Sequence, residues 1–403
     1  MIEKGKMGTI FVFLLFHICY SRIIKFYMKK YVKNSFVVAL SFVGAMIGVG
    51  LASGREVVSF FAKYGNFSLL FCVFSGVAFY VLIYLCLKIN RDVKNNHKNK
   101  NRKNDVKCNK YGNDMAKCNK QMVFDKIYNV ILYVCQIGIC SAMFAGLFSI
   151  FRSLGLSIVV CYFLLIVAFF LSVVILKNGK NMVFSLNFVL SLVLILFCFI
   201  LFFVKLFSGE FNFLVGSSFK IIAPFKSVLY AGMNVLTIYP LIREKSFYLK
   251  SKKEIVLISF LSSLFIVLIL FVVCLSILLF GGTNIGSDMV MLSISKSVSS
   301  VLYFAYVVLI LFSVFSTLLS TAYGSSKCLF HFKGGFVLSL TVSFLLSFVG
   351  FSNLIDFLYP VFGILFIVYI FLFVVMSGTG GEICVFSKSK KTQNHNKMCE
   401  KRY

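Results

Sequence analysis

The charged residues of this chain are segregated into short blocks between long apolar runs, and no other feature constrains its fold as strongly. Only 13% of the residues are charged, while 60% are hydrophobic. A typical soluble domain carries about 25% charged residues. The apolar runs are about 20 residues long, which is the length of helix that crosses the hydrocarbon core of a bilayer. The sequence therefore predicts an all-α integral membrane protein.

We expect about ten transmembrane helices, so both chain termini should lie on the same side of the membrane. Most of the 41 Lys and Arg residues fall in the loops on one side of this arrangement. The positive-inside rule identifies that side as the cytoplasm. The sequence thus predicts a multi-pass protein of the cell membrane with both termini cytoplasmic. The expected spans are residues 35–62, 67–88, 125–150, 157–176, 181–204, 222–242, 254–280, 298–323, 335–351 and 354–376.

Two five-helix halves follow from this layout, residues 28–204 and residues 205–376, with a basic cytoplasmic tail over 377–403. Residues 1–27 are interpreted as an N-terminal extension or a mis-start, because their apolar part is too short to cross a bilayer. The segment 89–124 is rich in Asn and Lys and has few apolar residues. Such a composition is typical of disorder, so we expect a disordered basic cytoplasmic loop there.

Composition also argues against several classes of function. The net charge of +28 does not indicate a nucleic-acid partner, because Lys and Arg lie at the edges of apolar segments, where they set membrane orientation. The sequence contains no nucleotide-binding glycine loop that ends in Lys-Ser/Thr. We therefore expect neither an enzyme nor an ATP-driven pump, no cofactor, and no metal other than sodium. The four histidines are isolated from one another: His17, His97, His331 and His395.

A glycine cluster interrupts the first expected span, in the sequence Gly44-Ala-Met-Ile-Gly48-Val-Gly50-Leu-Ala-Ser-Gly54. Each glycine weakens a helix by about 1 kcal/mol relative to alanine. Small residues four apart can also serve close helix packing. We favour a broken helix, because its freed N–H groups can bind a carboxylate and its freed carbonyls can bind a cation. The candidate substrate-binding residues here are Gly48, Gly50, Ala52, Ser53 and Gly54.

The sixth expected span carries a second set of unusual residues, Tyr230, Gly232 and Asn234, between two prolines. Asparagine in lipid is unfavourable unless it is paired. Spans one and six open the two five-helix halves, and interruptions at corresponding places in two halves indicate the binding site of a transporter. We therefore predict that the sixth span is broken as well, and that these three residues line the substrate site.

Two sources of ion coupling can be distinguished. The eighth span carries a row of hydroxyls that share one helix face and could bind a cation, or could bond only to neighbouring helices. The other source is Glu56, two residues after the glycine cluster. An acid within the membrane indicates function by default, although it could also simply pair with Arg55 or Lys226. The hydroxyl residues are Ser313, Ser316, Thr317, Ser320 and Thr321.

The first span, including Glu56 and the following Phe60, Phe61 and Gly65, resembles the first helix of YkvI-like bacterial membrane proteins. That family belongs to the amino acid–polyamine–organocation superfamily. The resemblance implies the LeuT-type 5+5 inverted repeat, with broken helices 1 and 6. Its sodium-coupled branch has Gly-x-x-x-Gly-x-Gly at the first break, which Gly44, Gly48 and Gly50 match. The resemblance further implies a sodium ion held by the carbonyls of Gly44 and Ile47 and the side chains of Ser316 and Thr317, with Ser313 one turn earlier.

These observations favour a secondary active transporter of a small organic solute, in particular an amino acid, coupled to a sodium or proton gradient by alternating access. Its partners would be the solute and the lipid bilayer, with no nucleic acid. The alternative is a membrane receptor subunit that senses an amino acid without transporting it, as germinant-receptor subunits of this superfamily are thought to do.

Overall fold

The computed structural model describes most of the chain. Its described residues are 30–103, 113–178, 180–209, 222–249, 251–280, 282, 286–328 and 335–378. They are almost entirely helical, and no strand occurs among them. The elements are α2 (Lys30–Met46), α3 (Val49–Ser53), α4 (Arg55–Phe60), η1 (Ala62–Phe67), α5 (Ser68–Lys103), α6 (Asn113–Ser153), α7 (Ile158–Asn178), α8 (Lys180–Phe207), α9 (Ala223–Ser246), α10 (Lys252–Phe280), α11 (Val290–Val298), α12 (Ser300–Cys328), α13 (Gly335–Leu346), η3 (Ser347–Val349), α14 (Phe351–Asn353), η4 (Leu354–Leu358) and α15 (Tyr359–Gly378).

Eight helical spans among the described residues are long and apolar enough to cross a membrane. They correspond to eight of the expected ten, which agrees with an all-α membrane protein. The other two expected spans consist of shorter pieces. The first is divided into α2, α3 and α4, and the ninth is α13 followed by a 3-10 turn, η3.

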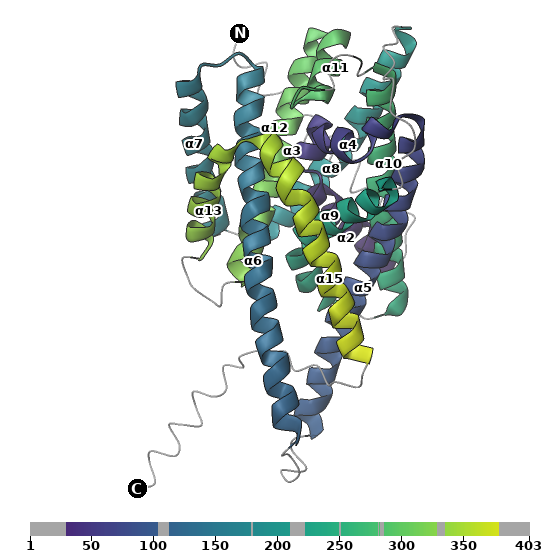
Figure 1. Ribbon diagram of the computed structural model, residues 1–403, viewed down its shortest axis with the longest axis vertical. Helices are drawn as coiled ribbons and strands as arrows, with labels where there is room; N and C mark the ends of the chain where they lie inside the picture. Colours follow the sequence, from purple (N-terminus) through teal and green to yellow (C-terminus); the bar gives the residue numbers. More distant parts are fainter. Residues whose placement is uncertain are drawn as a thin grey trace.

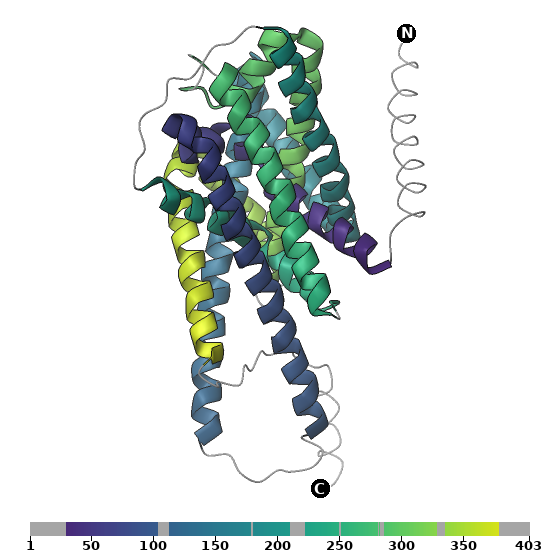
Figure 2. The same ribbon diagram turned by 90° about the vertical axis from the view of Figure 1, so that its right-hand side faces the viewer.

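Most of the helices run roughly along the long axis of the molecule (Figures 1 and 2). The most apolar stretch of α9 is 83% buried and that of α6 is 78% buried. α9 packs against α5 and α15, α6 against α12, and α2 against α8 and α10. By contrast, α7 is only 17% buried, so most of its apolar surface faces outward. An outward apolar face is expected where lipid is the solvent.

The segment expected to be a disordered loop, 89–124, is helical wherever the structure describes it. α5 continues to Lys103 and α6 begins at Asn113, and the two ends extend beyond the other helices (Figures 1 and 2). Adding residues to an existing helix avoids the cost of nucleation, so a polar segment without Gly or Pro can continue a span. Residues 89–103 and 113–124 are thus helical in the structure, where the sequence led us to expect a disordered loop. Residues 104–112, 1–27 and 379–403 lie outside the described residues.

The sixth span is not broken, contrary to the sequence-based prediction. α9 is one helix of 24 residues that passes through Tyr230 and Asn234 and continues past Pro240. A side chain of α6 donates the hydrogen bond that Pro240 cannot supply to its own helix. Of the two breaks expected from the sequence, the structure contains only the one in the first span.

Candidate functional site

The first span is interrupted twice within the glycine cluster. α2 ends at Met46 and α3 begins at Val49, so Ile47 and Gly48 lie outside both helices. The Gly48 N–H donates to the Met46 carbonyl at 2.8 Å, which leaves the Gly44 carbonyl without its helical donor. The second interruption is Gly54, whose φ of +83° is a left-handed conformation that glycine adopts without strain.

At the first interruption, a backbone carbonyl between α2 and α3 faces α12. The Ile47 carbonyl accepts hydrogen bonds from the hydroxyls of Ser313 (2.6 Å) and Thr317 (3.1 Å). All three residues are almost completely buried. Carbonyl and hydroxyl oxygens are the ligands that hard cations prefer. The structure thus brings together three of the residues that the resemblance implies for a sodium ion.

Ser316, the next residue of the expected cation set, is bonded elsewhere. Its hydroxyl donates to the side-chain oxygen of Asn187 on α8, and the Asn187 amide nitrogen donates to Ser320 at 2.9 Å. The Asn187 side chain is fully buried. It therefore connects α8 to the hydroxyl face of α12.

Gly44 is close to the same asparagine. A Cβ atom added at Gly44 would collide with the backbone carbonyl of Asn187. Backbone cannot move aside as the end of a side chain can. The glycine at this position therefore allows α2 and α8 to approach each other closely, and it holds Asn187 beside the break.

Glu56 lies on the other side of the interrupted segment. Its side chain is 3% exposed and packs against Gly50, where an added Cβ would collide with its carboxyl group. The Tyr230 phenol of α9 faces this carboxyl group. Even so, Glu56 Oε2 and Tyr230 Oη are buried without a hydrogen-bond partner of normal geometry among the described residues. Two unpaired polar atoms therefore face each other at the break.

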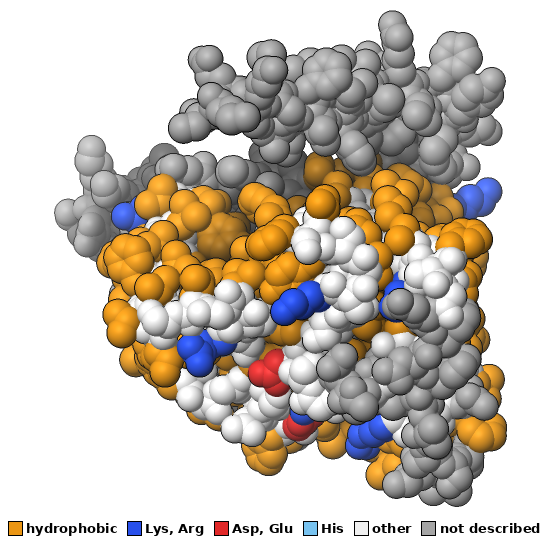
Figure 3. Space-filling model, turned by 90° about the horizontal axis from the view of Figure 1, so that it is seen from above, with side chains coloured by type: hydrophobic (Ala, Val, Ile, Leu, Met, Phe, Trp, Pro, Cys, Tyr) orange, Lys and Arg blue, Asp and Glu red, His pale blue; other side chains and the backbone are white. Residues whose placement is uncertain are grey.

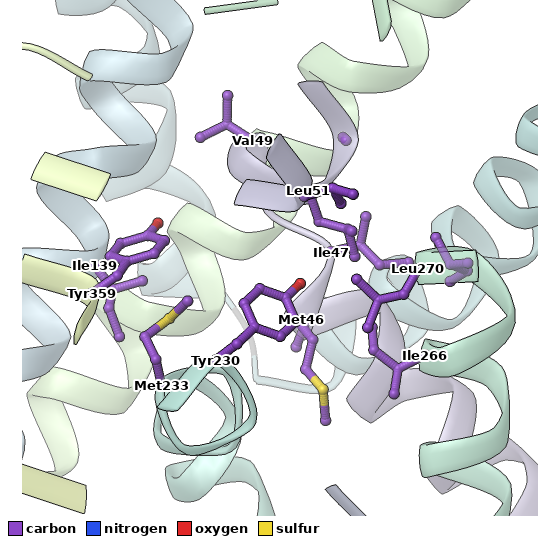
Figure 4. Packing of buried hydrophobic residues seen from close by; sticks show 14 of the residues in the cluster. Met46, Ile47, Val49, Leu51, Ile139, Tyr230, Met233, Ile266, Leu270 and Tyr359 are labelled. Carbon is purple, nitrogen blue, oxygen red and sulfur yellow. The ribbon is translucent and has the colours of Figure 1, made fainter. Parts of the chain in front are cut away.

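Aromatic packing fixes the position of Tyr230. The Tyr230 ring lies 5.3 Å from that of Phe60, 5.1 Å from that of Phe61 and 6.0 Å from that of Phe79, measured between centroids. Figure 4 shows the phenol rising from α9 towards Ile47 and Leu51 of the interrupted span. Since aromatic neighbours hold the ring, its hydroxyl cannot easily turn towards another partner.

The predicted alternative in which Glu56 pairs with Arg55 or Lys226 is wrong. Arg55 instead forms an ion pair with Asp356 of η4 at 3.0 Å, and Ser59 also donates to Asp356 at 3.0 Å. Neither ion pair in the described part of the chain includes Glu56. Its carboxyl group thus forms no ion pair with a side chain that the structure describes.

The Arg55–Asp356 pair joins α4 to the start of the tenth span. A second carboxylate, Asp288, accepts hydrogen bonds from Ser149 of α6 (3.2 Å) and from Ser352 of α14. Figure 3 views the molecule from above: a few charged side chains lie among uncharged polar groups, with hydrophobic side chains around them. Polar contacts therefore connect the segment 352–356 to two other parts of the fold.

The remaining candidates around the break have local partners. The carbonyl of Ala52 accepts a hydrogen bond from Tyr306 of α12 at 2.6 Å. The Ser53 hydroxyl donates to the Gly50 carbonyl at 3.2 Å, within the same short helix. A Cβ at Gly48 would come within 2.9 Å of the end of the Met143 side chain on α6. α6 and α12 thus enclose the interrupted segment.

Two predicted substrate residues of the sixth span do not face the break. A Cβ at Gly232 would meet the Gly363 carbonyl of α15 at 3.0 Å, so this glycine serves close helix packing. The Asn234 amide donates to the Tyr230 carbonyl at 3.1 Å, within its own helix. Of the three predicted residues on α9, only Tyr230 extends to the break.

Gln136 of α6 explains why α9 continues past its proline. Pro240 has no N–H, so the carbonyl four residues earlier, that of Leu236, loses its helical donor. The amide nitrogen of Gln136 donates to this carbonyl at 2.8 Å. Its amide oxygen is buried without a hydrogen-bond partner among the described residues. A side chain of a different span therefore supplies the hydrogen bond that the proline removes.

Asn187, Gln136 and Tyr306 were not identified from the sequence. A usable signal existed for the first two, since an amide side chain within an apolar span is unfavourable unless it is paired. Asn234 met that rule in the span that was expected to be broken, whereas Asn187 and Gln136 lie in spans without an expected break. Tyr306 had no such signal, because tyrosine is common in apolar spans of this chain.

Neither a protein-family model nor a curated protein matches this chain.

Proposed function

We propose that this protein is a secondary active transporter of a small organic solute, in particular an amino acid, coupled to a sodium or proton gradient by alternating access. The observation that carries the proposal is the interruption of the first span at Ile47 and Gly48. Non-helical backbone at membrane depth is tolerated only where it is buried in protein or lines a cavity. Transporters use such segments to bind solutes and coupling ions.

The surroundings of the break suit both tasks. On one side, the Ile47 carbonyl and the hydroxyls of Ser313 and Thr317 supply oxygen atoms for a sodium ion. On the other side, Glu56 and Tyr230 supply unpaired polar atoms for a solute or a proton. Each group includes an atom of the interrupted first span, Ile47 in one and Glu56 in the other, so occupation of one would affect the geometry of the other.

The proposed architecture is the 5+5 inverted repeat of LeuT-type transporters, with one modification. Only the first span is interrupted, because α9 is continuous. In this arrangement the sixth span contributes through the side chain of Tyr230 instead of through unwound backbone.

Uptake into proteoliposomes tests this function. A labelled mixture of the twenty common amino acids is supplied outside, and sodium and proton gradients are imposed separately. We expect accumulation above the equilibrium level under one of the two gradients, and its loss when that gradient is dissipated. Protein-free liposomes are the control. Specific binding without accumulation would contradict the transporter and favour the non-transporting receptor subunit.

A further inference from the structure

The last part of α9, residues 240–246, begins at the one proline inside this helix. Proline has no N–H, so the helical bond from position 240 to the Leu236 carbonyl is missing. The amide nitrogen of Gln136 on α6 donates to the Leu236 carbonyl at 2.8 Å and also to the Thr237 carbonyl at 3.4 Å. Both carbonyls belong to the part of α9 that precedes the proline. That part is therefore attached to α6 by bonds that do not depend on the direction in which 240–246 continue.

α12 approaches α9 closely at the same proline. A Cβ atom added at Gly324 would lie 2.7 Å from the Pro240 ring and 3.2 Å from Oε1 of Gln136. This amide oxygen is buried without a hydrogen-bond partner among the described residues, which is unfavourable. Gly324 follows Thr317 by two helical turns, about 10 Å along the same side of α12. Movement of α9 away from Gly324 would let water bond to the amide oxygen, so the packed arrangement has a cost that opening removes.

Two other helices hold the segment after the proline through side-chain hydrogen bonds. Arg243 donates to the side-chain oxygen of Asn129 on α6 at 3.4 Å, and the Tyr323 phenol of α12 donates to Glu244 at 3.0 Å. Arg243, Glu244 and Asn129 are half-buried. Asn129 is also where the apolar part of α6 begins, next to the helical extension. Hydrogen bonds between partly exposed side chains can be exchanged for bonds to water, so these contacts can release the segment.

We propose that residues 240–246 form a gate that swings about Pro240, with Gln136 anchoring the helix before the hinge and Arg243 and Glu244 holding the gate closed. The proposal rests on the proposed function and names the element that opens the interrupted span to one side of the membrane. Sharp changes in helix direction occur mostly at proline. Hinges are a few residues that absorb the change in φ and ψ while the segments on either side stay rigid. α9 is therefore continuous in the closed arrangement and bends when the gate opens.

Hydrogen–deuterium exchange of the full-length protein in detergent, measured by mass spectrometry, tests the hinge. Opening at the proline breaks the helical bonds that cross it, which are those donated by the amides of residues 241–244. Tyr323→Phe keeps the ring and removes the hydroxyl that donates to Glu244. We expect the amides of 241–244 to exchange several-fold faster in this variant than in the unmodified protein. The amides of 226–236 should exchange at an unchanged rate.

Two further variants connect this effect with the hinge. Tyr303→Phe makes the same chemical change near the other end of α12, where the hydroxyl donates to the Ser153 carbonyl at 3.4 Å. It should leave the exchange of 241–244 unchanged. Pro240→Ala restores a backbone N–H that can donate across the hinge. Combined with Tyr323→Phe, it should abolish the faster exchange.

The gate is overturned if Tyr323→Phe exchanges like Tyr303→Phe, if the faster exchange extends over the whole of α9, or if it persists in the Pro240→Ala background. These outcomes are separate from the fate of the proposed function. In the proteoliposome assay, Pro240→Ala should slow uptake several-fold, and uptake at the full rate would keep the transporter and refute the gate. The expected exchange pattern without any uptake by the unmodified protein would keep the hinge and refute transport.

Discussion

At the scale of single residues, Thr317 provides the clearest test of a cation site. Its hydroxyl donates to the Ile47 carbonyl at 3.1 Å, across from α12 to the first span. Thr317→Val nearly keeps the shape of the side chain and removes the oxygen. If sodium binds here, the variant should need a several-fold higher sodium concentration for half-maximal uptake, with a smaller change in solute affinity.

Thr321 is the matched control for that experiment. Its hydroxyl donates to the carbonyls of Thr317 and Leu318, both in its own helix and both at 3.0 Å. Thr321→Val should therefore leave the sodium dependence of uptake unchanged. Equal effects of the two substitutions would show that the hydroxyls of α12 serve helix packing and not ion binding.

Gly44 tests the close approach of α2 and α8. Gly44→Ala places a Cβ atom against the Asn187 backbone, which cannot move aside. Overpacking of this kind costs about 1–3 kcal/mol. We expect a lower unfolding temperature, measured by size-exclusion chromatography after heating. Gly286→Ala is the control, because a Cβ there meets open space; an unchanged Gly44→Ala protein would refute the close approach.

At the scale of elements, the continuity of α9 depends on a hydrogen bond from α6. Gln136→Leu should leave the Leu236 carbonyl buried and unpaired, at a cost of about 1–3 kcal/mol. Pro240→Ala restores a backbone N–H that can donate to the same carbonyl. We therefore expect Gln136→Leu to cost less stability in the Pro240→Ala background than alone.

The measurement is a double-mutant cycle of unfolding free energies for the two single variants and the double variant. Additive effects would contradict the structural explanation, because they would mean that Gln136 and the proline act independently. The free energy of unfolding of the unmodified protein is the common reference for all three variants.

At the scale of the whole molecule, the expected orientation can be tested through the cysteines of the basic segments. Cys108, Cys118 and Cys399 lie in parts of the sequence that we expect in the cytoplasm. Membrane-impermeant maleimide applied to intact cells should not label them, and should label them after the cells are permeabilised. Efficient labelling of intact cells would reverse the orientation, and with it the assignment of all loops.

The long helical extensions of α5 and α6 beyond their apolar parts are a feature of the whole molecule that hydropathy does not predict. The apolar parts of these helices end near Asp92 and begin near Asn129, close to the expected limits of the spans. The helices themselves continue well beyond those limits. Hydropathy locates the membrane boundary, whereas the end of a helix depends on the cost of breaking its hydrogen bonds.

The sequence by itself determined the all-α membrane class, most of the spans and the break in the first span. These properties depend on local quantities, namely the apolar length of a segment and the low helix propensity of the cluster from Gly44 to Gly54. The proximity of Ile47 to Ser313 and Thr317 was expected only through a family resemblance, and the hydrogen bonds between them place the three together.

Only the tertiary structure decided whether the unusual residues of the sixth span break it. Pro240 and Asn234 disturb an isolated helix, but Gln136 of α6 bonds to the carbonyl that the proline frees, and Asn234 bonds within α9. Likewise, Arg55 bonds to Asp356, 301 residues away along the chain, and not to Glu56 beside it. Such partners come from distant segments, so no local pattern in the sequence could identify them.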